Sequence, residues 1–342
     1  MLIMGSEMTS CDFALPTIDR LSADNFSAAG DAPALVLPAA VMPPVGVQAV
    51  LIGVDAEARL PSTHRDRFDV LVTTAPDAPA PWISVEAKLF DAHVRALVDA
   101  VNDSPVAATM LMQVLRMNEV LPFDQAIMIE SMAYSSLLGG AEFRRWLDSV
   151  KQAQAGNTSP ADPVLMDRID NAVTLTLNDP VNRNAMTAEM RDGLFAALAN
   201  LIDDPSNPTL TLSGAGSCFS TGGHIPEFGS ATDLAAAHIH RTLHSNALAL
   251  HDLGQRATVR FHGAAIGSGL EVGAAAHHRI AAPDSWFQLP ELGMGLIPGA
   301  GGTVTLPRVI GRHRTAWMVL TGKRLTARHA LAMGLIHQIV AV

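Results

Sequence analysis

The first half of the chain changes from a strand-like to a helix-like spacing of apolar residues. Three short runs rich in Val and Leu, separated by Pro and Asp, predict a small sheet over 34–37, 48–54 and 68–73. From about residue 86 the apolar residues recur every three or four positions. This spacing predicts helices over 86–103, 106–118, 124–138 and 141–150.

The second half mixes both spacings. Apolar runs at 164–166 and 173–177 flank Asp170-Asn171 and predict a hairpin, and Thr187 is a predicted N-cap for the helix that follows. We also predict a strand over 210–212 and a helix over 234–250. The chain is longer than the size at which one core usually stops growing. We therefore expect an N-terminal region at 1–151, a polar linker at 152–163 and a second domain at 164–342.

Composition narrows the class of protein. Acidic residues outnumber basic ones, 33 to 23, and the net charge of -10 argues against nucleic acid as a partner. Cys11 and Cys218 are too few for a disulfide framework. The N-terminus lacks the basic and apolar regions of a signal peptide, and no apolar run reaches the roughly 20 residues of a membrane span. We expect a soluble cytoplasmic enzyme with no membrane partner.

A glycine-rich junction carries the candidate chemistry. The predicted strand at 257–261 leads into Gly267, Ser268 and Gly269, and then into a helical run whose first turn contains Glu271. Glycines at such a junction let a substrate approach the main chain and leave amide N–H groups free for a negatively charged oxygen. Glu291 follows a second extended run twenty residues later. Two carboxyls in poorly hydrated surroundings can have different pKa values, so that one acts as base and the other as acid.

Further motifs make the pattern specific. Besides the two glutamates, the chain contains an Ile-Pro-Gly-Ala-Gly-Gly-Thr run at 297–303, a glycine loop at 217–225 and an Asn-Ala pair at 184–185. These motifs, in this order, resemble those of the crotonase superfamily, the enoyl-CoA hydratases and isomerases, over residues 163–342. The resemblance implies an α/β fold: a crotonase-like spiral of ββα units, preceded here by a small α/β N-terminal region with a helical segment.

The resemblance also implies roles for individual residues. Glu271 and Glu291 would be catalytic, and the main-chain N–H groups of Gly223 and Ser268 would form the oxyanion hole. No metal and no separate cofactor are implied, because coenzyme A is part of the acyl-CoA substrate, and the expected assembly is a homo-oligomer, a trimer or hexamer. The expected contacts with substrate or CoA are Arg183, Asn184, Ala185, Met186, Thr221, Gly222, His224, Gly267, Leu289 and Gly299.

The predicted reaction is the addition of water to a 2-enoyl-CoA thioester. Double-bond isomerisation, which needs mainly Glu291, is one alternative, and a non-catalytic acyl-CoA binding protein is another. The second alternative draws on two departures from the family pattern, Ser268 in place of a glycine and His224 in place of an aspartate. Relatives of this type continue past the strand near 339 with helices that cover the active site. We therefore expect the predicted helices of 85–150, from the same or a neighbouring subunit, to cover it here.

Overall fold

The computed structural model describes residues 23–150 and 160–341. The N-terminal region contains a four-stranded parallel sheet. Its strands follow one another in the order β1-β2-β3-β4. Three of them are the strands predicted from the sequence, while the fourth, a two-residue strand, was not predicted. Most of the predicted linker at 152–163 lies outside the described residues. The strand bounds are β1 Ala34–Pro38, β2 Val50–Asp55, β3 Val70–Thr73 and β4 Ile83–Ser84.

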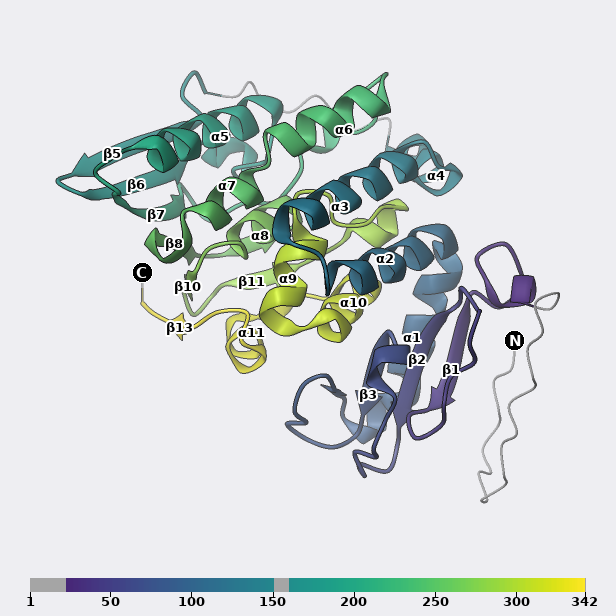
Figure 1. Ribbon diagram of the computed structural model, residues 1–342. Coiled ribbons are helices and arrows are strands. Elements are labelled where there is room, and N and C mark those ends of the chain that lie inside the picture. Colours follow the sequence, from purple (N-terminus) through teal and green to yellow (C-terminus); the bar gives the residue numbers. More distant parts are fainter. Residues whose placement is uncertain (1–22, 151–159, 342) are drawn as a thin grey trace.

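Four helices follow this sheet, and their bounds agree with the predicted ones to within a few residues. Helix α2 packs on β2 of the N-terminal sheet and on the late helices α9 and α10, and α3 lies beside α2 (Figure 1). Each of these two early helices contacts α9, so the N-terminal region packs directly on the glycine-rich end of the chain. The bounds are α1 Phe90–Asp103, α2 Pro105–Asn118, α3 Phe123–Leu138 and α4 Ala141–Val150.

A six-stranded sheet forms the other side of the molecule, with the strand order β13-β10-β8-β7-β6-β5. The predicted hairpin is present as the antiparallel pair β5 and β6, and the remaining neighbours are parallel. Thr187 caps α5 as expected, because its side chain accepts a hydrogen bond from the Met190 N–H at 3.1 Å. The bounds are β5 Val164–Ile169, β6 Ala172–Leu177, α5 Ala188–Asp203, β7 Thr209–Gly214, β8 Ala257–Phe261, β10 His278–Ala281 and β13 Gln338–Ile339.

A small three-stranded sheet, ordered β12-β11-β9, carries the glycine-rich segments. Helix α8 begins directly after β9, and the short 3-10 helix that begins with Glu291 follows β11. This arrangement brings the two predicted catalytic segments to the ends of neighbouring parallel strands. The bounds are β9 Ala264–Ile266, α8 Ser268–Gly273, β11 Trp286–Gln288, α9 Gly302–Ile310, α10 Arg312–Thr321, β12 Leu325–Thr326 and α11 Ala327–Met333.

The prediction of one helix over 234–250 is wrong. The segment forms two helices, α6 (Leu234–Leu243) and α7 (Asn246–Asp252). Ser245 begins the second helix, because its hydroxyl accepts from the Leu248 N–H at 3.2 Å. A serine that caps a new helix competes with continuation of the old one, and the apolar spacing alone did not reveal this competition.

The largest apolar core extends across both halves of the chain. It includes residues of the N-terminal sheet, such as Val50, together with Phe261 and Leu306 from the second half. The Phe261 ring lies edge-on to Phe219 at 4.9 Å and to Phe287 at 5.2 Å between ring centroids. The division into two domains stays a prediction. Among the described residues, no helix is both long and apolar enough to cross a membrane.

Candidate functional site

The first glycine loop follows β7 and is held by main-chain contacts. The Met186 N–H donates to the Gly222 carbonyl at 2.8 Å. Gly222 has a φ of +84°, which favours glycine, and a Cβ on it would lie 2.7 Å from the Ile266 carbonyl oxygen. A Cβ on Gly223 would likewise lie 2.7 Å from the Phe228 ring. The loop is therefore pressed against the end of β9 and has no room for larger residues at these two glycines.

The second glycine loop joins β9 to α8. Gly267 has a φ of +48°, and its N–H donates to the Gln288 carbonyl at 3.0 Å. Ser268 is the first residue of α8, where an amide has no partner within the helix. Within the described residues neither the Gly223 N–H nor the Ser268 N–H donates a hydrogen bond. The two amides predicted for the oxyanion hole are thus unused, and they belong to loops that touch each other.

Glu271 lies in the first turn of α8 and is 2% exposed. Its Oε2 accepts hydrogen bonds from the N–H groups of Ala300 at 2.7 Å and Gly302 at 2.9 Å, both in the 297–303 run. Burial raises the pKa of Glu271 to about 7, while these main-chain donors act in the opposite direction. The glycine-rich run therefore holds this carboxyl in one position and favours its ionised form.

Glu291 lies beside the second glycine loop. A Cβ on Gly267 would lie 2.7 Å from its Oε1, so glycine is needed there for the carboxyl to approach. Its Oε2 is buried and has no hydrogen-bond partner among the described residues. Burial, and next the negative charge of Glu271, raise the pKa of Glu291 well above its usual value. The structure thus brings both predicted glutamates to the second glycine loop.

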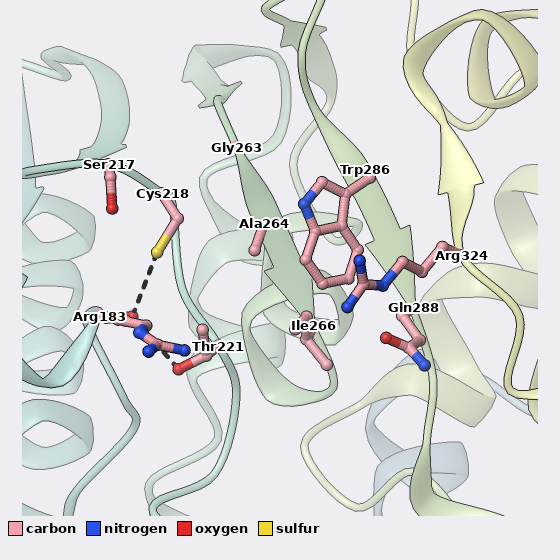
Figure 2. A pocket seen from close by; sticks show the side chains of 10 residues that line it. All are labelled: Arg183, Ser217, Cys218, Thr221, Gly263, Ala264, Ile266, Trp286, Gln288 and Arg324. Atoms are coloured by element: carbon pink, nitrogen blue, oxygen red, sulfur yellow. Dashed lines mark hydrogen bonds between the residues drawn. The ribbon is translucent and has the colours of Figure 1, made fainter.

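A cavity of about 390 Å³ opens beside these loops. Figure 2 shows Arg183 and Thr221 on one side of it, and Trp286, Gln288 and Arg324 on the other. The Arg324 guanidinium lies 4.1 Å from the centroid of the Trp286 ring. Two arginines on opposite walls give the cavity a positive character, which suits phosphate groups.

The second half of the chain matches a known protein family. The model of the enoyl-CoA hydratase/isomerase family matches residues 168–342. The chain belongs to the enoyl-CoA hydratase/isomerase family.

Relatives and solved structures are similar to the same half of the chain. A Bacillus subtilis protein named "Putative enoyl-CoA hydratase/isomerase YngF" is 33% identical over 168 residues, which are 49% of this chain and 65% of the relative. The fatty acid oxidation complex subunit alpha of Shewanella loihica is 33% identical over 181 residues, 51% of this chain and 26% of the relative. The chain thus spans less than two thirds of either relative.

A solved structure from Legionella pneumophila, named as an enoyl CoA hydratase/isomerase (crotonase), is similar in fold. It has a TM-score of 0.50 and 22% identity, covering 53% of this chain and 71% of that one. An enoyl-CoA hydratase structure from Thermoplasma volcanium has a TM-score of 0.49 and 30% identity, with coverage of 53% and 73%. The predicted crotonase-like α/β fold is confirmed.

Several other predicted contact residues lie inside the protein. Asn184 is fully buried, and its amide accepts from the Asp179 N–H and donates to the carbonyls of Ala215, Cys218 and Phe219. Its side chain therefore positions the first glycine loop, and a direct contact with substrate stays a prediction. Ala185, Met186 and Leu289 are also buried. His224 lies 3.4 Å from the Glu227 carboxylate.

A third buried carboxyl, Glu130 of α3, was missed from the sequence. Its oxygens accept from the N–H groups of Gly301 at 2.6 Å and Thr303 at 2.7 Å, and from the Thr303 hydroxyl at 2.7 Å. Burial, and next the charge of Glu271, raise the pKa of Glu130 to about 8, although these donors lower it. The only local signal was an acid after the apolar run 126–129, within the face that helical spacing assigns to the core.

The expected cover is present. Helix α3 packs on α9 through Glu130, and the ring of Tyr134 on the same helix packs against Gly299. Helix α4 contributes Trp146, whose ring lies edge-on to Phe228 with 5.7 Å between centroids. Since Phe228 packs on Gly223, these two N-terminal helices enclose the side of the site where both glycine loops meet.

Proposed function

We propose that this protein is an enoyl-CoA hydratase-type enzyme that adds water across the double bond of a 2-enoyl-CoA thioester. The observation that carries the proposal is the unequal environment of two buried carboxyls beside two unused amides. Glu271 has two main-chain donors, whereas one oxygen of Glu291 has none. Two negative charges in one dry site repel each other, so Glu271 loses its proton first, as pH rises through about 7, while Glu291 keeps its own.

In this mechanism the thioester carbonyl oxygen accepts hydrogen bonds from the N–H groups of Gly223 and Ser268. Glu271 takes one proton from a water molecule while the water oxygen bonds to carbon 3, and negative charge moves to the thioester oxygen. The two amides stabilise that charge, each by about 3 kcal/mol in comparable sites. Glu291 then donates its proton to carbon 2, which completes the addition of one water.

The coenzyme A part of the substrate would occupy the neighbouring cavity. Thr221 and Ile266, which line it, are next to the two glycine loops. Arg183 and Arg324 would supply the positive charge for the phosphates of the nucleotide. Assembly into trimers or hexamers and a cytoplasmic location stay predictions.

The test is hydration of crotonyl-CoA, followed by loss of the absorbance of the conjugated thioester. Glu271→Gln and Glu291→Gln preserve side-chain shape and remove the proton transfer, so each should lower kcat by about 100-fold or more. Glu86→Gln, an exposed acid paired with Lys88, is the matched control and should leave kcat unchanged. Conversion of 3-enoyl-CoA that needs Glu291 and not Glu271 would instead indicate an isomerase. CoA binding without turnover of any enoyl-CoA would indicate a binding protein.

A further inference from the structure

Tyr134, the only tyrosine of the chain, comes from α3 and reaches the same site. Its ring lies flat against Gly299, where a Cβ would be 2.4 Å from the ring Cδ2. Gly299 immediately precedes Ala300, whose N–H binds Glu271. Tyr134, a residue of the N-terminal region, therefore contacts the direct neighbour of Ala300, which donates a hydrogen bond to the proposed base Glu271.

The Tyr134 ring also contacts an arginine. The Arg241 guanidinium lies 4.8 Å from the ring centroid. That guanidinium is held in turn, because Nη1 donates to the hydroxyls of Ser131 at 2.8 Å and Ser135 at 3.1 Å. Both serines belong to α3, one on each side of Tyr134 in the sequence. The Tyr134 ring thus packs against both the Gly299 backbone and an arginine that α3 itself binds.

The hydroxyl of Tyr134 remains available. Among the described residues it has no hydrogen-bond partner, and Tyr134 is half-buried. Burial raises the pKa of Tyr134, and the charges of Glu271 and Glu291 raise it further while Arg241 lowers it, so the phenol is neutral at physiological pH. Glu291 also has one buried oxygen without a partner. Tyr134 therefore lies beside Gly299, next to a donor of Glu271, and Glu291 lies beside Gly267, in the loop that leads into the helix of Glu271.

We propose that Tyr134 is a further catalytic residue, which orients the attacking water by accepting its second hydrogen. The inference rests on the proposed hydratase function. A water molecule that gives one hydrogen to Glu271 has a second hydrogen and two lone pairs left. With that second hydrogen bonded to the phenol oxygen, the orientation of the water is fixed and a lone pair points at carbon 3. No extra proton is transferred: the first goes to Glu271, and carbon 2 receives its own from Glu291.

The experiment compares two reactions of the same site in wild type and Tyr134→Phe. Hydration of crotonyl-CoA needs an oriented water. Exchange of the C2 hydrogens of butanoyl-CoA for deuterium in heavy water needs only the oxyanion amides and Glu291. Loss of one hydrogen bond to a reacting group corresponds to about a tenfold effect. We expect kcat for hydration to fall by about tenfold or more, with KM and the exchange rate unchanged.

Met132→Leu, an exposed change on the same helix, is the control and should leave both rates unchanged. An equal fall of hydration and exchange in Tyr134→Phe would indicate a packing role and overturn the proposal. Unchanged hydration would overturn it as well, while the proposed function would stand. If the wild type exchanges the C2 hydrogens of butanoyl-CoA but does not hydrate crotonyl-CoA, both the role of Tyr134 and the proposed hydratase function are refuted.

A second measurement does not depend on the variant folding. Protein grown with 3-fluorotyrosine has a single fluorine nucleus, because the chain has one tyrosine. Its NMR resonance should move when butanoyl-CoA binds and should not move with free coenzyme A, which lacks the acyl group. A resonance that is indifferent to the acyl group would contradict the placement of Tyr134 beside the reacting carbons.

Discussion

Replacement of Glu130 by alanine tests whether the N-terminal helices hold the catalytic run in place. The substitution removes the acceptor for the Gly301 N–H, the Thr303 N–H and the Thr303 hydroxyl, all buried at the start of α9. A buried donor left without a partner costs about 1–3 kcal/mol. The substitution also removes the repulsion between Glu130 and Glu271, which offsets part of this loss of stability. We expect the free energy of unfolding to fall by about 3 kcal/mol.

Urea denaturation followed by tryptophan fluorescence measures this change, and crotonyl-CoA hydration measures its effect on the site. Because Ala300 and Gly302, which hold Glu271, flank Gly301, kcat should fall together with stability. Gln125→Ala is the control, since Gln125 is exposed on the same helix. A loss of stability below about 1 kcal/mol would mean that the three donors find other partners, and the reasoning from burial would fail.

Three further predictions concern charge and the glycine loops. As pH rises from about 4.5 to about 8, stability should fall by about 1.4 kcal/mol per pH unit for each proton that the folded state holds and the unfolded state does not, because Glu271 and Glu130 have folded-state pKa values raised to about 7 and 8. Urea midpoints should show this fall, and Glu271→Gln should reduce it; a stability that rises over this range would contradict the pKa directions. Arg324→Ala should raise KM for crotonyl-CoA about fivefold. Steady-state kinetics should show no such change with the crotonyl thioester of N-acetylcysteamine, which lacks the nucleotide, and an equal rise with both would exclude a phosphate contact. Ser268→Gly keeps the amide donor and should leave kcat within about threefold of wild type; a large loss would assign a role to the hydroxyl.

The sequence predicted those features that depend on local spacing. Helix bounds in the N-terminal region followed from the apolar period, and the meeting of Glu271 and Glu291 at one loop followed from motifs at the ends of two strands that prove to be neighbours. Contacts between distant segments left no such signal. Glu130 binds residues more than 170 positions away, and Arg324 meets Trp286 only through the pairing of β11 with β12. These groups became visible only when the packing of α3 on α9 and the small sheet were known.

The most direct test of the central claim is the carbonyl stretching frequency of a bound thioester. Isotope-edited infrared spectra of butanoyl-CoA labelled with carbon-13 at the thioester carbon would report on that carbonyl alone. Two amides aimed at the oxygen lengthen the C=O bond, so the band should move to lower frequency on binding. A band at the same frequency in the bound and free ligand would mean that the amides of Gly223 and Ser268 do not hold the carbonyl, and the proposed mechanism would lose its basis.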